Sequence, residues 1–391
     1  MRISFLITLL LCIPIKAYEE INQEVLNQLT EFIIKDPATQ GVLISKNNQI
    51  IFEHYADGYD QYNLGTTWSL AKTFYAALIG VAIEKGLDVS LDDPIKKFIS
   101  EFDGDIRGEV SLRNLLEMKS GFAITEHENQ EMFFSLNNLE FALDVKKIAP
   151  AGEKYEYNNI NTMLLNPIIE SIFNKEPHQV LVEEIFAPLG IKNYGLWEDT
   201  DGNDMTYYGI DITPRDLLKF GQLIDNDGVW NNQQIINKDF VKESITPLSE
   251  GVGEWFGLHW SVRKFDQNKT LVGLEVTDGE MLFLVPEEDI VFVRLTKYIH
   301  DPTKGYSIDF GPLAYLLWLP YSWVRAITEF LAPSQDDSEE FVDDPNINIP
   351  NTQAKGISIY HCPFTTPNNC PGVSKVQDLI FGLSEPNPNL E

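Results

Sequence analysis

Two strand–turn–strand patterns, far apart in this 391-residue chain, limit the folds that it can adopt. The first joins residues 41–45 to 50–54 through a polar turn, and the second joins 281–286 to 290–295 through an acidic turn. β-Branched and apolar residues, which favour strands, are frequent in both. Hairpins from distant parts of a chain can form one antiparallel sheet, and the mostly helical patterns at about 89–204 would then form an inserted lobe. The sequence therefore predicts an α+β (mixed α/β) fold: an antiparallel sheet flanked by helices, plus an inserted all-helical lobe.

Composition excludes several classes of function. The chain has 29 basic and 59 acidic side chains, a formal net charge of −30, which would repel nucleic acid and an anionic membrane. Hydrophobic residues make up 43% and aromatic residues 12%, so most of the chain can bury a core rather than remain disordered. We therefore expect a folded protein without a nucleic-acid partner.

The N-terminus has the pattern of a secretory signal peptide over residues 1–17. A basic start at Arg2 is followed by an apolar run that is too short to span a bilayer, and Ala17 provides a small residue at the cleavage point. A retained anchor is the alternative. A second alternative is lipidation of Cys12. Leu11 disfavours it, because a small residue is expected before a lipidated cysteine. The prediction is a secreted or periplasmic protein.

Composition also changes near the C-terminus. Residues 20–319 alternate apolar segments with turn residues, which predicts one folded domain over 18–332. Residues 333–391 are acidic and rich in proline and asparagine, which predicts a tail or accessory loop rather than core. The tail holds Cys362 and Cys370, the two cysteines of the mature chain. Their even number, close spacing and exported context favour a disulfide, with two free thiols as the alternative.

A possible nucleophile and base lie on one helical turn. The apolar pattern after Ser69 predicts a buried helix that ends at Gly86 and includes Lys72. Residues three apart share a helix face, and a lysine shielded from water can lose its proton and activate a serine. Ser-x-x-Lys alone is a weak signal, since a helix cap followed by a solvated lysine has the same sequence. Here the apolar surroundings of Lys72 strengthen it, because an idle buried charge is costly.

A second element is Tyr157-Asn158-Asn159. A phenol near a lysine can share its proton and pass it to a leaving group, and an asparagine amide can bind both a substrate carbonyl and the lysine. A turn without a catalytic task is the alternative.

These motifs and their order resemble the serine β-lactamase and penicillin-binding-protein superfamily, on the class C and esterase side. The resemblance extends through residues 90–95, 112–121 and 214–223, and the last two segments look most like the 6-aminohexanoate-dimer hydrolase branch. It implies a mixed α/β lobe facing a helical lobe, with the active site between them.

The resemblance also implies roles for single residues. Ser69 would be the acylated nucleophile, Lys72 its base, and Tyr157 the acid and base that assists acyl transfer. Asn159 matches the amide that orients the substrate. No cofactor is implied.

The third motif of the superfamily is altered here, within residues 271–280. Aligned on the hydrolase branch, the second oxyanion amide comes from Thr277, and with the lactamase spacing it comes from Leu274. No lysine, arginine or histidine occurs in this stretch, and Asp278 and Glu280 would repel a substrate carboxylate.

Other candidate sites are weak. The six histidines show no His-Glu-x-x-His and no paired helical spacing, so no metal site is predicted. No Gly-x-Ser-x-Gly elbow is present. Tyr207 and Tyr208 are interpreted as a packed aromatic pair, with substrate contact as the alternative. Residues 310–331 are expected to cover the sheet, and contact of Trp318 and Trp323 with a membrane surface is the alternative.

Three hypotheses of function follow. The first is an exported serine hydrolase that cleaves a neutral or cationic small-molecule ester or amide. The second is a D,D-peptidase or β-lactamase, which requires a cation for the substrate carboxylate. The third is an inactive binding protein that retains the fold.

Overall fold

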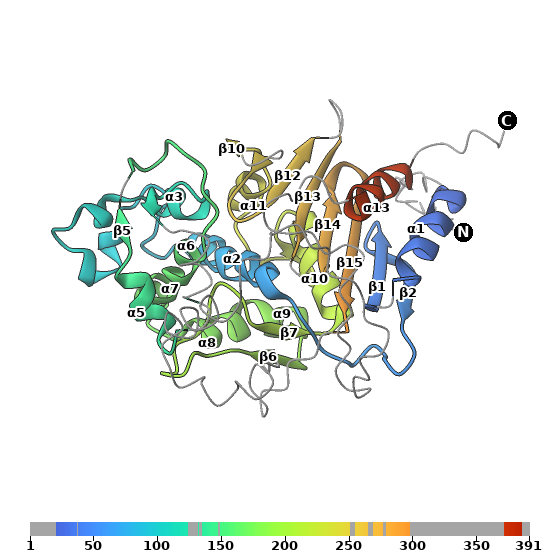
Figure 1. Ribbon diagram of the computed structural model, residues 1–391, viewed down its shortest axis with the longest axis horizontal. Coiled ribbons are helices and arrows are strands. Elements are labelled where there is room, and N and C mark those ends of the chain that lie inside the picture. The colour runs from blue at the N-terminus through green and yellow to red at the C-terminus, as the bar shows by residue number, and fades with distance from the viewer. Residues whose placement is uncertain are drawn as a thin grey trace, which may run out of the picture.

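A computed structural model describes residues 21–36, 38–123, 132, 135–147, 149–250, 255–264, 269–276, 279–297 and 371–384. Its centre is an eight-stranded antiparallel sheet in the order β10-β11-β12-β13-β14-β15-β1-β2 (Figure 1). In chain order these strands are β1 (Thr39–Lys46), β2 (Gln49–Tyr55), β10 (Ser249–Glu250), β11 (Trp255–Phe256), β12 (Ser261–Lys264), β13 (Thr270–Glu275), β14 (Met281–Val285) and β15 (Ile290–Thr296).

The two predicted hairpins are confirmed, and they join side by side at one end of this sheet, where β2 is the edge strand. β1 pairs with β2 on one side and with β15 on the other, with Leu43 opposite Val293. β14 pairs with β15 in the second hairpin. Segments from the two ends of the sequence therefore share one sheet, and the rest of the fold is inserted between them.

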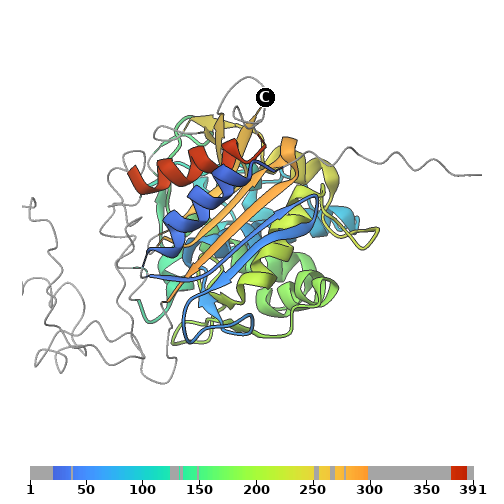
Figure 2. The ribbon, with the colours of Figure 1, turned by 90° about the vertical axis from the view of Figure 1, so that its right-hand side faces the viewer.

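One face of the sheet is covered by two helices, α1 (Gln23–Ile34) and α13 (Pro371–Gly382), which lie side by side (Figure 2). Leu29 of α1 and Ile380 of α13 are fully buried in the same apolar cluster. This corrects part of the prediction for 333–391, because residues 371–384 pack into the core rather than forming a tail. Composition did not predict this helix because the acidic, proline-rich stretch before it dominates the average composition of residues 333–391.

Three predictions lie outside the described part of the chain: the disulfide between Cys362 and Cys370, the signal peptide over residues 1–17 and the covering segment over residues 310–331. Of the helices that are described, none is both long enough and apolar enough to cross a membrane.

The other face packs on α10 (Pro214–Asp225), which separates the sheet from α2 (Ala71–Glu84). Thr213 caps α10: its hydroxyl accepts the Asp216 N–H at 3.1 Å and donates to the Asp216 carboxylate at 2.9 Å. Phe220 of α10 stacks on Phe74 of α2 with ring centroids 3.6 Å apart. The helix that carries Lys72 therefore packs on α10 through an aromatic pair, and α10 in turn packs on the sheet.

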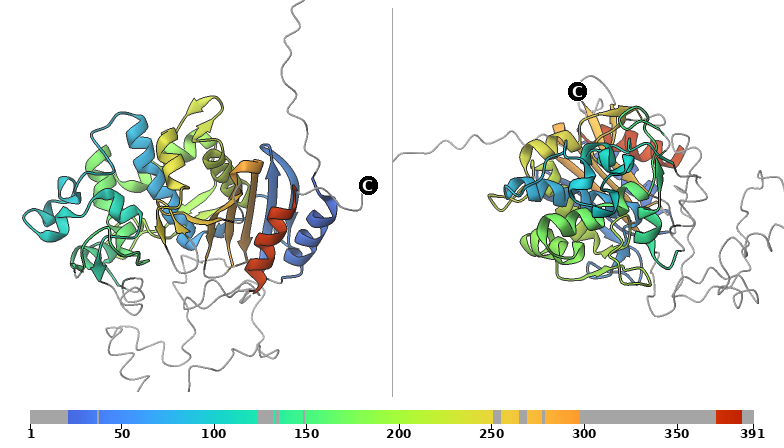
Figure 3. Two further views of the ribbon diagram at one scale, coloured as in Figure 1. Left: turned by 90° about the horizontal axis from the view of Figure 1, so that it is seen from above. Right: turned by 90° about the vertical axis from the view of Figure 1, so that its left-hand side faces the viewer.

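The segment between the hairpins forms the predicted helical lobe, at the opposite end of the molecule from α1 and α13 (Figure 3). Its helices are α3 (Leu112–Leu116), α5 (Asn138–Leu143), α6 (Ile160–Met163), α7 (Leu165–Phe173), α8 (Pro177–Leu181) and α9 (Ala187–Leu189), joined by the 3₁₀ turns η2 (Ile95–Lys97), η3 (Ser100–Phe102) and η4 (Ile106–Glu109) and by a π-helical turn, η5 (Val182–Phe186). Short strands accompany them: β4 (Phe122–Ala123) pairs with β5 (Lys146–Lys147), β8 (Val229–Trp230) pairs with β9 (Gln233–Gln234), and β3 (Gly65–Thr66), β7 (Ile210–Ile212) and β6 (Tyr194–Leu196) form a small sheet.

Residues 71–82 of α2 are all buried, so the helix is covered on every side over this length. It is preceded by the 3₁₀ turn η1 (Trp68–Leu70) and ends before Gly86, which has a φ of +68°. A helix that is apolar all round belongs in the centre of a protein. Lys72 is therefore part of the core.

Gly80→Ala should destabilise the protein by about 1–2 kcal/mol, measured by urea unfolding. A Cβ at position 80 would lie 2.4 Å from Cδ1 of Phe240 and 2.5 Å from Cγ2 of Ile236. Overpacking of this kind costs about 1–3 kcal/mol, and the better helix propensity of alanine offsets only part of that. Adding Phe240→Leu should recover part of the loss. A Gly80→Ala chain as stable as the wild type would contradict this packing.

Candidate active site

Ser69 lies at the entrance to α2, in the turn η1. The turn is attached to the small sheet by Thr67, whose backbone N–H and hydroxyl both donate to the Ile210 carbonyl, at 2.9 and 2.8 Å. Trp68 has a φ of +46°, an uncommon conformation for a bulky residue. Its ring packs 5.9 Å from that of Trp197. The strained residue next to Ser69 is thus held by aromatic packing, and such outliers concentrate at functional sites.

Lys72 follows Ser69 by one helical turn, as predicted. Its Nζ lies 3.2 Å from Ser69 Oγ and donates to the Tyr207 carbonyl at 2.7 Å. The side chain is only 2% exposed, and this burial holds the pKa of the ammonium well below its usual range. Burial therefore favours the neutral form of the lysine, which is the form that can accept a proton from the serine.

Tyr157 contacts the same oxygen of Ser69. Its hydroxyl is 3.1 Å from Ser69 Oγ, and its ring centroid is 5.3 Å from Lys72 Nζ. Asn159 is half-buried at the N-cap position of α6, two residues after Tyr157. The structure thus brings together Ser69, Lys72 and Tyr157, with Asn159 on the same short segment as the tyrosine.

The altered third motif lies at the turn from β13 to β14. Leu274 is half-buried on β13, whereas Thr277 and Asp278 lie outside the described residues. Glu280 is fully buried and accepts a hydrogen bond from the Thr296 hydroxyl. This corrects the expectation that Glu280 repels a substrate carboxylate, because its side chain is buried inside the protein. The sequence pattern of the strand could not predict this burial, since the burial depends on which segments cover each face of the sheet.

A buried cation lies behind that turn. Arg294 on β15 is fully buried, pairs with Asp36 at 2.6 Å and donates to the Gly279 carbonyl. The guanidinium is thus engaged inside the fold.

Comparison with known proteins places this geometry in a family. The family model described as Beta-lactamase matches residues 32–306 of the chain. The chain belongs to the beta-lactamase family. The resemblance drawn from the sequence motifs is thereby confirmed, and the family consists of hydrolases that are generally serine hydrolases.

Individual relatives of this beta-lactamase family member are distant. An uncharacterized protein of Alkalihalophilus pseudofirmus is 23% identical over 72% of this chain and 90% of its own. The 6-aminohexanoate-dimer hydrolase of Paenarthrobacter ureafaciens is 19% identical over 70% of this chain and 76% of its own. The octameric penicillin-binding protein homologue from Pyrococcus abyssi has a TM-score of 0.57 and 20% identity, covering 70% of this chain and 73% of that one. The structural likeness confirms the predicted fold.

The segment 204–208 takes part in this family member's site in a way that the sequence motifs did not indicate. Tyr207 and Tyr208 are buried, and their rings meet edge to face with centroids 4.3 Å apart, which supports the predicted aromatic pair. The backbone of Tyr207 has a further role, because its carbonyl accepts from Lys72. A backbone contact of this kind leaves no residue signature in the sequence.

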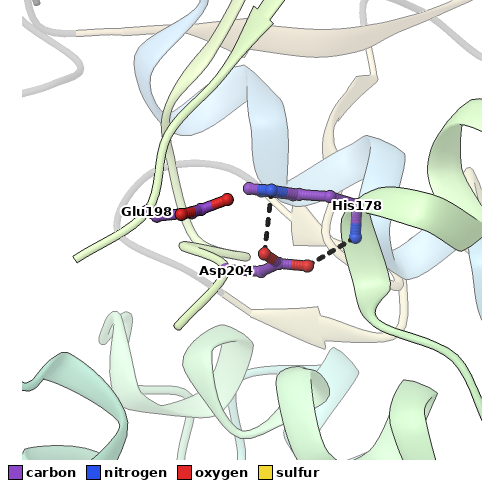
Figure 4. A group of neighbouring side chains, drawn as sticks. All are labelled: His178, Glu198 and Asp204. Carbon is purple, nitrogen blue, oxygen red and sulfur yellow. Dashed lines mark hydrogen bonds and ion pairs between the residues drawn. The ribbon is translucent and has the colours of Figure 1, made fainter. Parts of the chain in front are cut away.

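One end of this segment is anchored by the group in Figure 4. Ligand-type atoms of His178, Glu198 and Asp204 lie within 4.8 Å of one another. His178 Nδ1 is 2.9 Å from Asp204 Oδ1, and the His178 backbone N–H donates to Asp204 Oδ2 at 2.6 Å. Because both oxygens of Asp204 hold the first turn of α8, we interpret the group as a clamp between α8 and the segment 204–208. Glu198 and Asp204 face each other across an isolated β-bridge, whereas His178 comes from α8, so sequence spacing could not predict the contact with the histidine.

His259 is a second residue that the sequence did not single out. It is 1% exposed with a φ of +62°; its Nδ1 lies 2.9 Å from the Leu116 carbonyl and its Nε2 3.0 Å from the Thr162 hydroxyl. Burial is the main cause that lowers the pKa of His259 to about 3, and Lys72 contributes when it is protonated. The imidazole is therefore neutral at physiological pH and within electrostatic range of the lysine.

Proposed function

We propose that this chain is a serine hydrolase that cleaves an ester or amide bond through an acyl-enzyme on Ser69. One observation carries the proposal: Lys72 Nζ and Tyr157 Oη both lie within hydrogen-bonding distance of Ser69 Oγ, and the lysine is buried. A serine with a desolvated amine and a phenol at its hydroxyl is the arrangement that an activated nucleophile requires.

In the proposed first step, neutral Lys72 accepts the Ser69 proton while Oγ attacks the carbonyl carbon of the substrate. The oxyanion is stabilised by backbone N–H groups, of which we assign one to Ser69 and the other to Thr277. Collapse of the intermediate breaks the bond to the leaving group, which takes the proton through Lys72 or Tyr157. Water then attacks the acyl-enzyme with the same groups as base, and the acid is released.

The preferred substrate has no carboxylate next to the scissile bond. Residues 271–280 contain no lysine, arginine or histidine, and Arg294 behind the turn is engaged with Asp36. A neutral or cationic ester or amide therefore suits the site better than a penicillin or a D-Ala-D-Ala terminus. Similarity to a protein named 6-aminohexanoate-dimer hydrolase supports a small-molecule substrate.

Intact-mass analysis after treatment with a fluorophosphonate tests the nucleophile. The wild-type chain should gain one adduct, Ser69→Ala none, and Ser90→Ala, at an exposed serine, one adduct as in the wild type. The mass also shows whether residues 1–17 are removed, as the predicted signal peptide requires. Label retained in Ser69→Ala, or no label on the wild type, would refute the proposal. Labelling by fluorescent penicillin would instead favour a D,D-peptidase or β-lactamase.

A further inference from the structure

The Tyr207 carbonyl that binds Lys72 is itself supported by buried side chains outside the group of Ser69, Lys72 and Tyr157. Thr206, the preceding residue, is fully buried, and its hydroxyl donates to the Thr162 carbonyl at 2.7 Å. Thr162 is also fully buried, and its hydroxyl meets Nε2 of His259. A chain of hydrogen bonds therefore runs from Lys72 through the segment 204–208 and α6 to His259.

The direction of each hydrogen bond in this chain follows from its partners. Nδ1 of His259 faces a backbone carbonyl, which only accepts, so the proton of the neutral imidazole lies on Nδ1. Nε2 then accepts from the Thr162 hydroxyl, and the Thr206 hydroxyl donates to a carbonyl. Because the network is buried, each lost bond would leave a polar group without water to replace its partner.

We propose that Thr206, Thr162 and His259 are positioning residues that hold the Tyr207 carbonyl, and through it Lys72, against Ser69. The inference rests on the proposed function and deepens it. Thr206 adjoins Tyr207, so a shift of its side chain moves the carbonyl that accepts from Lys72. Thr162 lies in α6, the helix that begins directly after the segment of Tyr157, so one network supports both groups that contact the serine.

The test measures how fast the fluorophosphonate labels Ser69 in the full chain, with the melting temperature measured in parallel. Thr206→Val keeps the shape of the side chain but removes its donor, and we expect labelling to slow by about tenfold or more, since small displacements of a catalytic group cost that much. Thr206→Ser restores the hydroxyl and should label nearly as fast as the wild type. Thr162→Val provides a second variant and should also slow labelling.

Thr30→Val is the matched control. Thr30 is a buried threonine of α1 whose hydroxyl donates to the Leu26 carbonyl at 2.8 Å. Loss of this hydroxyl should lower the melting temperature without slowing the labelling of Ser69. Equal slowing by Thr30→Val and Thr206→Val would show that stability alone matters and would overturn the inference. Wild-type rates in Thr206→Val and Thr162→Val would overturn it too, with the proposed function intact. A wild-type chain that takes no label would refute the proposed function itself.

Discussion

Replacing Lys72 with methionine is expected to slow acylation of Ser69 by about 10³-fold while raising the melting temperature of the protein at pH 7. The loss of rate follows from the loss of the general base. The gain in stability follows because burial lowers the pKa of Lys72 far below that of a lysine in the unfolded chain. At a pH between the folded and the unfolded pKa, the folded state loses about 1.4 kcal/mol for each unit by which the pH lies below the unfolded value.

The dependence on pH provides the sharper check. The unfolded chain binds the Lys72 proton more tightly, so wild-type stability falls as pH drops from the unfolded pKa, near 10.4, towards the folded one. The advantage of Lys72→Met should therefore shrink as the pH rises towards 10. The Tyr207 carbonyl loses its donor in this variant, which costs about 1–3 kcal/mol and opposes the gain. Lys85→Met, at the exposed end of α2, should change neither labelling nor the pH trend. A variant less stable than the wild type at every pH would contradict the argument.

A steep loss of stability in acid is the second large effect that we expect, and it comes from His259. The folded pKa of about 3 lies below the value near 6.5 of an unfolded histidine, so the unfolded chain binds the extra proton. Stability is unaffected above about pH 6.5 and is lost as the pH falls towards 3, by about 1.4 kcal/mol per pH unit. Over the whole window the loss is roughly 4–5 kcal/mol.

His259→Asn isolates this contribution from the carboxylates that also titrate in acid. Asparagine tolerates the positive φ of this position and does not titrate. The free energy of unfolding, measured with urea at several pH values between 7 and 4, should fall less steeply with decreasing pH in the variant. The difference in steepness should correspond to the uptake of about one proton fewer on unfolding. Equal slopes would mean that His259 is not held neutral by its surroundings.

The parts of the site that the sequence predicted are local. Ser69, in the 3₁₀ turn η1, and Lys72, in the first turn of α2, are three residues apart, and helical periodicity alone places them on one face. The two hairpins are signalled by β-branched residues around polar turns. The meeting of Tyr157 with Ser69 was expected only from the order of motifs in a known superfamily, because no local pattern links residues so far apart.

Other features depended on packing between distant segments. The burial of Glu280 depends on β15, which follows it in the sequence, and the place of α13 in the core depends on α1 at the other end of the chain. The neutral state of His259 comes from its inaccessible position rather than from its neighbours in sequence.

By itself, then, the sequence determined the helix that presents Ser69 and Lys72, the two hairpins and the excess of negative charge, because these follow from periodicity, propensity and composition. Only the tertiary structure decided which carbonyl holds the lysine, which charges are buried and which polar residues support them. The physical reason is that propensities act within a few residues along the chain, whereas desolvation and hydrogen-bond partners are set by whichever segments meet in space.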